Sequence, residues 1–302
     1  MGWSSPDSWL TRLFSGDPLV ILLAFLVVIA LPSLLHLYFY TQSARTKVVP
    51  TFLLLGPSGA GKTSLVTLLQ KRSSNPEDTE PALTRTSQVP WGVSLLLPAS
   101  VPLGSNKYRS RNDVSLKDKH PTRYVMIDTP GHGKLRTDQA LSQIKNPGLR
   151  GVIFVVDASV LGSSDTSFLR DTAGYLHDTL LALQRQRTGK ASGKTKTNIP
   201  VLIAANKQDL FTALPTGAVR ERLQAEIERV RVSRSKGLST VGQQPDTDAE
   251  EEVLGGGGED KFSFKLMEDE YGISIDVVGA AVKGDEAGKG VRRWEEWIGG
   301  CL

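Results

Sequence analysis

A long apolar stretch lies near the N-terminus of the chain. No charged residue occurs between Asp17 and Arg45, and apolar side chains fill most positions from 19 to 40. About 20 apolar residues in a helix, each rising about 1.5 Å, are enough to cross the ~30 Å hydrocarbon core of a bilayer. The pattern therefore predicts one transmembrane helix, a signal anchor, over residues 18–42.

Three other interpretations of this stretch fit less well. A buried core helix of this length, or an interfacial helix, would carry a polar face. A cleavable signal peptide would begin with a positive segment, whereas Asp7 and Asp17 accompany the single Arg12. Positive charge follows the stretch from Arg45 onward. The positive-inside rule therefore predicts a short lumenal tail at residues 1–17 and a cytosolic C-terminal part.

Beyond residue 46, short apolar runs alternate with stretches of helical periodicity. Apolar runs of roughly four to eight residues bounded by turns are typical of buried strands. Their alternation with helices predicts an α/β fold of the P-loop NTPase class, with a mostly parallel six-stranded sheet and helices on both faces. This domain is expected to cover residues 46–302. The expected strands are 48–55, 124–127, 151–156, 201–205 and 273–278, and the expected helices include 64–71 and 291–298.

The first strand runs into a glycine-rich turn that matches the P-loop pattern at every position. Residues 56–63 read Gly-Pro-Ser-Gly-Ala-Gly-Lys-Thr, between a strand and a helix. Backbone N–H groups of such a turn surround a β-phosphate, Lys62 reaches the β- and γ-phosphates, and the Thr63 hydroxyl binds Mg²⁺. The expected nucleotide contacts here are Gly56, Pro57, Ser58, Gly59, Ala60, Gly61, Lys62, Thr63 and Ser64.

A second motif follows the strand at 124–127. Asp128 ends this strand and precedes Thr-Pro-Gly. A carboxylate at this place is expected on the Mg²⁺ side of a bound nucleoside triphosphate, and the Gly131 N–H is expected to sense the γ-phosphate. Together with the P-loop, the motif indicates a nucleotide and a magnesium ion.

The motif Asn-Lys-Gln-Asp at residues 206–209 selects the base. Guanine offers adjacent N1–H and N2–H₂ donors, which the single carboxylate of Asp209 can accept, whereas adenine offers no such pair. Lys207 is expected to cover the plane of the base, and Asn206 to tie this loop to the P-loop. The sequence therefore predicts binding of GTP or GDP with Mg²⁺.

Two further loops are expected to complete the site. Thr86 is the expected hydroxyl ligand of Mg²⁺ from the first switch region, with Thr84 and Ser87 as open alternatives. After the last strand, a backbone N–H of Ala280 or Ala281 is expected to contact the guanine O6. The expected metal ligands are Thr63, Thr86 and Asp128.

Composition and charge add limits rather than functions. A net charge of +4, from 36 basic and 32 acidic residues, gives no indication of direct nucleic-acid binding. The single cysteine, Cys301, excludes an intrachain disulfide and a cysteine-rich metal site. Three polar or glycine-rich stretches, near 105–122, 188–198 and 237–260, are expected to be flexible insertions.

Taken together, the chain resembles the beta subunit of the signal recognition particle receptor, a membrane-anchored Arf-like GTPase family. The resemblance rests on the apolar span, the P-loop, Thr-Arg-Thr-Ser at 84–87, Asp-Thr-Pro-Gly-His at 128–132, Asn-Lys-Gln-Asp and the basic segment 228–236. It implies a single-pass protein of the endoplasmic reticulum membrane. It also implies the receptor alpha subunit as direct partner, with the signal recognition particle, ribosome and translocon as indirect ones.

The residue after Asp-Thr-Pro-Gly, compared with Ras-type GTPases, suggests the catalytic groups. His132 stands where those proteins carry the glutamine that orients the attacking water, so His132 and Lys62 are the expected catalytic residues. No arginine finger is apparent, and unaided hydrolysis is expected to be slow. Two alternatives remain: a vesicle-coat GTPase of the Arf or Sar kind, and a GTP-dependent scaffold with negligible hydrolysis.

Overall fold

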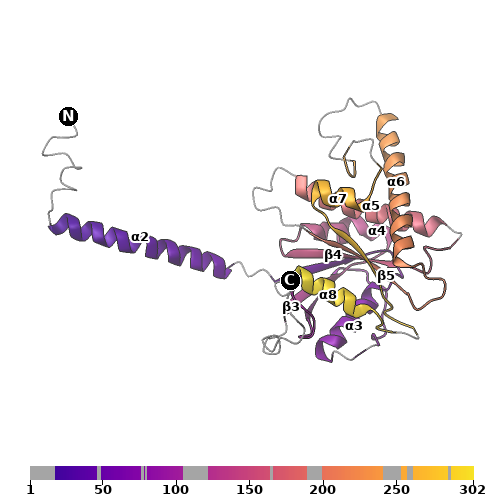
Figure 1. The fold of residues 1–302 in the computed structure, drawn as a ribbon, viewed down its shortest axis with the longest axis horizontal. Helices are drawn as coiled ribbons and strands as arrows, with labels where there is room; N and C mark the ends of the chain where they lie inside the picture. Colours follow the sequence, from indigo (N-terminus) through magenta and orange to yellow (C-terminus); the bar gives the residue numbers. More distant parts are fainter. Residues whose placement is uncertain are drawn as a thin grey trace. The chain divides into compact units, whose positions relative to one another are not determined.

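The chain consists of two compact units, residues 1–48 and 49–302 (Figure 1). The predicted tail at 1–17 lies outside the residues described, as do the predicted insertions near 105–122 and 188–198 except for residues 122 and 188. The structure is a computed structural model that describes residues 18–45, 49–75, 78, 80–104, 122–163, 166–188, 199–240, 253–256, 261–284 and 287–302.

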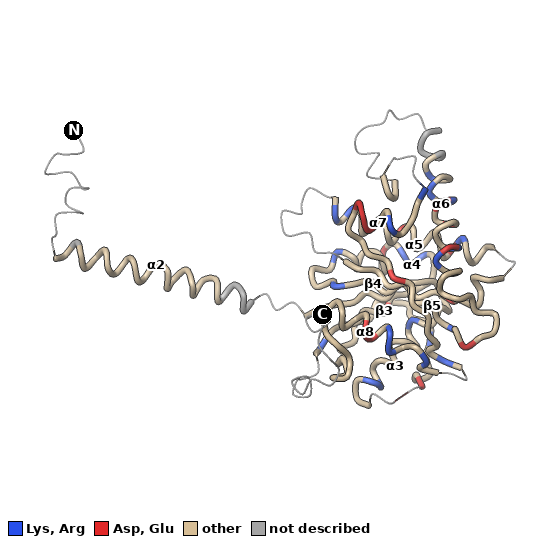
Figure 2. Tube along the Cα trace, viewed as in Figure 1, with Lys and Arg blue, Asp and Glu red and all other residues tan. Residues whose placement is uncertain are grey.

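The described part of the first unit is one helix, α2 (Pro18–Arg45). Its segment Ile21–Tyr40 is long and apolar enough to cross a membrane by length and composition. Figure 2 shows no Lys, Arg, Asp or Glu along the part of the helix whose side chains are described. Its large apolar side chains are exposed within the chain, and none of the segment is buried. The predicted helix at 18–42 is therefore present and extends three residues further.

The second unit is built on a six-stranded sheet in the order β2-β3-β1-β4-β5-β6. All neighbouring strands run parallel except β2 and β3, which pair antiparallel. The mostly parallel six-stranded sheet is as predicted. The strands are β1 (Thr51–Leu55), β2 (Trp91–Leu96), β3 (Arg123–Asp128), β4 (Leu149–Asp157), β5 (Val201–Asn206) and β6 (Ile275–Gly279).

Helices cover both faces of this sheet, as Figure 1 shows. Because side chains alternate along a strand, Leu53 and Leu55 face one layer while Phe52 and Leu54 face the other. The first layer includes α5, α6 and α7, and the second includes α3 and α8. The helices are α3 (Lys62–Ser74), α4 (Gly133–Leu135), η3 (Arg136–Ala140), η4 (Leu141–Lys145), α5 (Thr166–Thr188), α6 (Thr216–Thr240), α7 (Phe264–Tyr271) and α8 (Val291–Cys301).

Two parts of the predicted flexible insertion at 237–260 are ordered in the structure. Helix α6 continues to Thr240, and residues 253–256 pack against the domain. Leu254 is fully buried, the Gln184 amide donates to the Val253 carbonyl (3.0 Å), and Gly255 N–H donates to Gln184 Oε1 (2.9 Å). Burial of Leu254 and the two hydrogen bonds of Gln184 therefore order a turn within this glycine-rich stretch.

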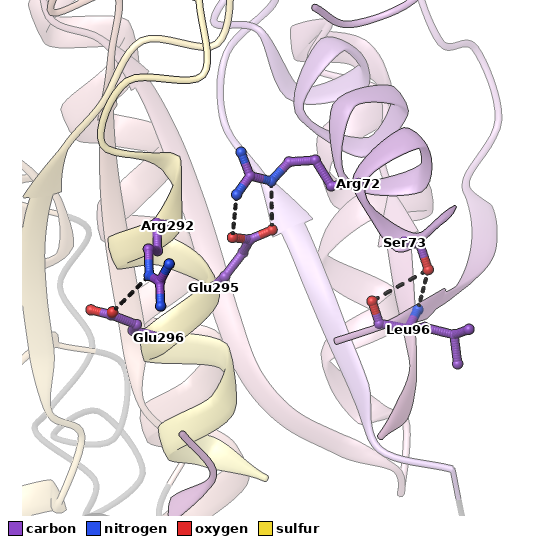
Figure 3. Close-up of polar contacts among 6 residues, drawn as sticks. All are labelled: Arg72, Ser73, Leu96, Arg292, Glu295 and Glu296. Atoms are coloured by element: carbon purple, nitrogen blue, oxygen red, sulfur yellow. Dashed lines mark hydrogen bonds and ion pairs between the residues drawn. The ribbon is translucent and has the colours of Figure 1, made fainter. Parts of the chain in front are cut away.

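A buried ion pair joins the helix that follows the P-loop to the C-terminal helix (Figure 3). Arg72 of α3 donates to both carboxylate oxygens of Glu295 in α8, at 2.9 and 3.0 Å. The Glu295 side chain is only 2% exposed. Burial raises the pKa of Glu295, against the attraction of Arg72. Next to this pair, Leu96 N–H of β2 donates to Ser73 Oγ (2.6 Å). These contacts hold α3 against its neighbours.

We predict that Glu295→Ala lowers the free energy of unfolding of residues 49–302 by about 3 kcal/mol, because it leaves the Arg72 guanidinium buried without its partner. Urea unfolding followed by tryptophan fluorescence measures this loss. Asp178→Ala removes the exposed pair with Arg234 and serves as the control, with an expected loss below about 1 kcal/mol. Equal losses in the two variants would contradict a special role for the buried pair.

Candidate functional site

A cleft of about 420 Å³ opens at the edge of the sheet where the parallel strands end. In parallel sheets this edge collects the loops that follow the strands, and ligands bind there. The cleft is lined by Ser58, Gly59, Gly61, Lys62, Thr63, Ser64, Thr84, Arg85, Thr86, Ser87, Thr129, Gly131, Asn206, Lys207, Asp209, Val282, Lys283 and Gly284. Most of the predicted contacts therefore share one cavity.

The turn between β1 and α3 forms one wall of the cleft. Lys62 lies at the start of α3 and its ammonium donates to the carbonyls of Gly56 (2.7 Å) and Pro57 (2.8 Å). Burial lowers the pKa of Lys62 to about 8, although the Asp128 carboxylate raises it. Gly61 has φ +100°, and a Cβ at this position would overlap the side-chain nitrogen of Asn206. Glycine is thus required here by both backbone and space.

Three oxygen-bearing side chains meet beside this turn. The Thr63 and Ser87 hydroxyls each donate to Asp128 Oδ2 at 2.7 Å, and lie 3.0 Å from each other. The other carboxylate oxygen, Asp128 Oδ1, is buried and has no hydrogen-bond partner among the described residues. Hydroxyl and carboxylate oxygens are the ligands that Mg²⁺ prefers. The cluster therefore fits a magnesium ion.

The structure places Ser87, not the expected Thr86, in this oxygen cluster. Thr86 lines the cleft, and Thr84 Oγ1 lies 3.3 Å from Ser64 Oγ. The sequence offers several hydroxyls within four positions, and only the path of the loop decides which of them reaches Asp128. Ser87 was among the alternatives that the sequence left open.

Asn206 connects the phosphate side of the cleft to the opposite wall. Its amide donates to the Ala60 carbonyl (2.8 Å), and its oxygen accepts from Val282 N–H (3.1 Å). The predicted tie between this loop and the P-loop is therefore present, and it extends to the loop after β6. Asp209 also lines the cleft, and its Oδ1 is buried without a hydrogen-bond partner among the described residues.

The predicted contacts Ala280 and Ala281 do not line the cleft. Ala280 N–H donates to the Ala205 carbonyl (3.0 Å) and Ala281 N–H to the Lys289 carbonyl (2.9 Å), so both amides are already paired. The Ala280 amide is occupied because backbone pairing with β5 continues one residue beyond β6, and the Ala281 amide is occupied by the segment before α8. Val282, Lys283 and Gly284 line the cleft instead. GTPases of this kind usually carry Ser-Ala-Lys in this loop, and alignment of its lysine with Lys283 would have placed Val282 at the cleft.

The expected catalytic residue His132 is exposed and is not among the residues that line the cleft. It precedes α4, whereas its neighbour Gly131 does line the cleft. Arg136 Nε donates to the Gly131 carbonyl (3.1 Å), and its two terminal nitrogens donate to the carboxylate of Asp171 on α5. This arginine was not identified from the sequence, because its partner lies 35 positions away.

Comparison with known proteins decides the family. A family model described as the signal recognition particle receptor beta subunit matches residues 47–270. The chain belongs to this family. The family model begins after the apolar helix and covers every loop described above except the one after β6.

Individual relatives agree with this assignment. The chain is 29% identical over 254 residues to the signal recognition particle receptor subunit beta of Saccharomyces cerevisiae, covering 82% of this chain and 83% of that protein. It is 35% identical to a chain in the solved SRb-GTP/SRX complex of the receptor from Chaetomium thermophilum, with a TM-score of 0.65 over 83% of this chain and 99% of that one. The SRb-GDP-Mg structure from the same organism is 33% identical, with a TM-score of 0.58 over 85% and 100%.

We predict that Asn206→Ala lowers the free energy of unfolding by about 2 to 4 kcal/mol. The substitution removes the hydrogen-bond partner of two buried backbone groups, the Ala60 carbonyl and the Val282 amide. Thermal unfolding by circular dichroism measures the effect. Asn75→Ala, at an exposed position, is the control and should stay within about 0.5 kcal/mol of the wild type. A mild effect of Asn206→Ala would show that the two loops are not held by this side chain.

Proposed function

We propose that this chain is the membrane-anchored, GTP-binding subunit of a signal recognition particle receptor, acting as a GTP/GDP switch in cotranslational targeting to the endoplasmic reticulum. The observation that carries the proposal is the position of Asp209. Asp209 lines the same cleft as the P-loop, its buried Oδ1 has no hydrogen-bond partner among the described residues, and Asn206 links the P-loop to the loop after β6. This arrangement suits a guanine base with its phosphates on the P-loop.

Different residues of the cleft bind the base, the phosphates and the magnesium ion. Asp209 accepts from N1–H and N2–H₂ of guanine, and the backbone of residues 282–284 faces the base edge in place of Ala280 and Ala281. Lys62 and the N–H groups of the P-loop bind the phosphates. Thr63, Ser87 and Asp128 hold Mg²⁺, which when bound neutralises phosphate charge.

Hydrolysis would need a water positioned beside the γ-phosphate. Gly131 lines the cleft and can donate its N–H to that phosphate, and His132 is the adjacent group able to orient the water. Because the His132 side chain is exposed, it must turn toward the cleft to do so. Slow hydrolysis that speeds up when a partner orders this segment follows from that position. Single-turnover assays with and without a partner separate an active GTPase from a scaffold.

The relatives support a proposal for the partner and the location. One solved relative is an SRb-GTP/SRX complex, and another is SRb with GDP and Mg. We infer that the GTP form of this chain binds the receptor alpha subunit and that the GDP form binds it less well, the switch loops being ordered by the γ-phosphate. Helix α2 spans the membrane, with residues 1–17 lumenal. Resistance to alkaline carbonate extraction would distinguish this anchor from the reversible attachment of an Arf- or Sar-type GTPase.

We predict that Asp209→Asn weakens GTP and GDP binding by about 100-fold or more, because an amide cannot accept both guanine donors. The amide can instead donate to the C2 carbonyl of xanthine, so the variant should gain affinity for xanthosine nucleotides. Titration of the full chain in detergent with fluorescent nucleotides measures both. Wild-type protein that prefers ATP, or a variant that keeps its preference for guanine, would overturn the proposal.

Magnesium binding distinguishes Ser87 from Thr86. We predict that Ser87→Ala raises the Mg²⁺ concentration needed for tight GTP binding by about 10-fold or more, since it removes an oxygen next to Asp128. Thr86→Ala is the matched control on the adjacent residue and should have a smaller effect. The measurement is GTP affinity across a magnesium titration. The reverse order of effects would return the role to Thr86.

A further inference from the structure

Lys207 has an unusual backbone conformation. Its φ is +64°, and it is the only non-glycine residue with positive φ in the part of the chain that the structure describes. An L-residue in the left-handed region is disfavoured by contact between Cβ and the backbone, so the surrounding structure must hold it there. Conformations of this kind gather at functional sites. The group that holds Lys207 is therefore of interest.

A buried carboxylate binds the end of the Lys207 side chain. The ammonium forms an ion pair with Asp157 Oδ2, and the Asp157 side chain is only 6% exposed, whereas that of Lys207 is 37% exposed. The lysine thus lines the cleft with its charged end held by a buried carboxylate. This is the opposite of the usual exposed lysine, whose charged end extends into water.

Asp157 is itself held firmly. It is the last residue of β4, and the register of the sheet pairs it with Asn206, the residue before Lys207. Its second oxygen, Oδ1, accepts from Ser159 N–H (3.1 Å) and from the Ser159 hydroxyl (2.6 Å). The two strand ends therefore place the carboxylate next to the Asn-Lys-Gln-Asp motif with little freedom to move. A lysine bound to this group is fixed before any ligand arrives.

We propose that Asp157 is a positioning residue for nucleotide recognition, which holds the Lys207 side chain across the face of the base. This inference rests on the proposed function, since the cleft must bind a guanine nucleotide. A side chain that is already ordered loses less conformational freedom on binding. Because the contact is with the face of the base, Asp157 supports GTP, GDP and inosine nucleotides equally, whereas Asp209 distinguishes among bases by their edges.

The test is a double-mutant cycle on the full chain in detergent, with fluorescent GDP and GTP. Asp157→Ala is expected to weaken both nucleotides by the same factor, about 5- to 10-fold, and Lys207→Ala by at least as much. With Lys207→Ala already present, Asp157→Ala should change affinity by less than about 2-fold, because its effect passes through the lysine. Inosine nucleotides should weaken in parallel with guanine nucleotides.

Two further variants separate positioning from folding. Asp178→Ala breaks the ion pair with Arg234 away from the cleft and should leave nucleotide affinity unchanged. Asp157→Asn keeps an acceptor for Ser159 and guards against loss of folding, which thermal unfolding monitors. It should weaken binding less than Asp157→Ala does, since it retains a weaker acceptor for the lysine.

Several results would overturn the assignment. Additive losses in the cycle would mean that Asp157 does not act through Lys207. A lower unfolding temperature with unchanged nucleotide affinity would mean that the ion pair serves the fold alone. Failure of the proposed function would appear differently, because the wild-type chain itself would then bind no guanine nucleotide; guanine binding that is insensitive to Asp157 would reject the positioning role only.

Discussion

Parallel pairing of strands is the constraint on which the site depends. Because five of the six strands run in one direction, the loops that follow them meet along one edge of the sheet. The register places Asp128 beside Leu54, just before the P-loop, and Asp157 beside Asn206. The sheet thus brings residues that are far apart in the sequence together at one edge. Packing on both faces fixes this register, since a slip of one residue would exchange the side chains that pack in the two layers.

The hydrogen bonding of buried carboxylates differs between the α3–α8 contact and the cleft. Between α3 and α8, the Arg72–Glu295 pair is closed on itself, with both carboxylate oxygens used. In the cleft, Asp128 and Asp209 each leave one buried oxygen unpaired among the described residues. An unpaired buried acceptor is unfavourable in the protein alone. In the proposed function, a metal ion would pair the oxygen of Asp128 and base donors would pair that of Asp209.

Much of the fold and site could be predicted from the sequence because the decisive signals are local. An unbroken apolar run identifies β1, and the glycine turn that follows it has one geometry that fits phosphate. Strand β2 was not anticipated, since its half-exposed pattern and its glycine resemble a loop. The choice of Ser87 over Thr86, and of Val282 to Gly284 over Ala280, depends on where a loop turns. The turn around Leu254 was assigned to flexible sequence because Gln184, which pairs with its neighbours Val253 and Gly255, is about 70 residues away.

The turn held by Gln184 also affects how the length of the chain can vary. Gln184 donates to Val253 and accepts from Gly255, and Leu254 between them is fully buried. An insertion within residues 253–255 would separate these groups and leave the buried Gln184 amide without its partners, which costs stability. This turn is therefore a poor place for an epitope or a fluorescent reporter, although its sequence is rich in glycine.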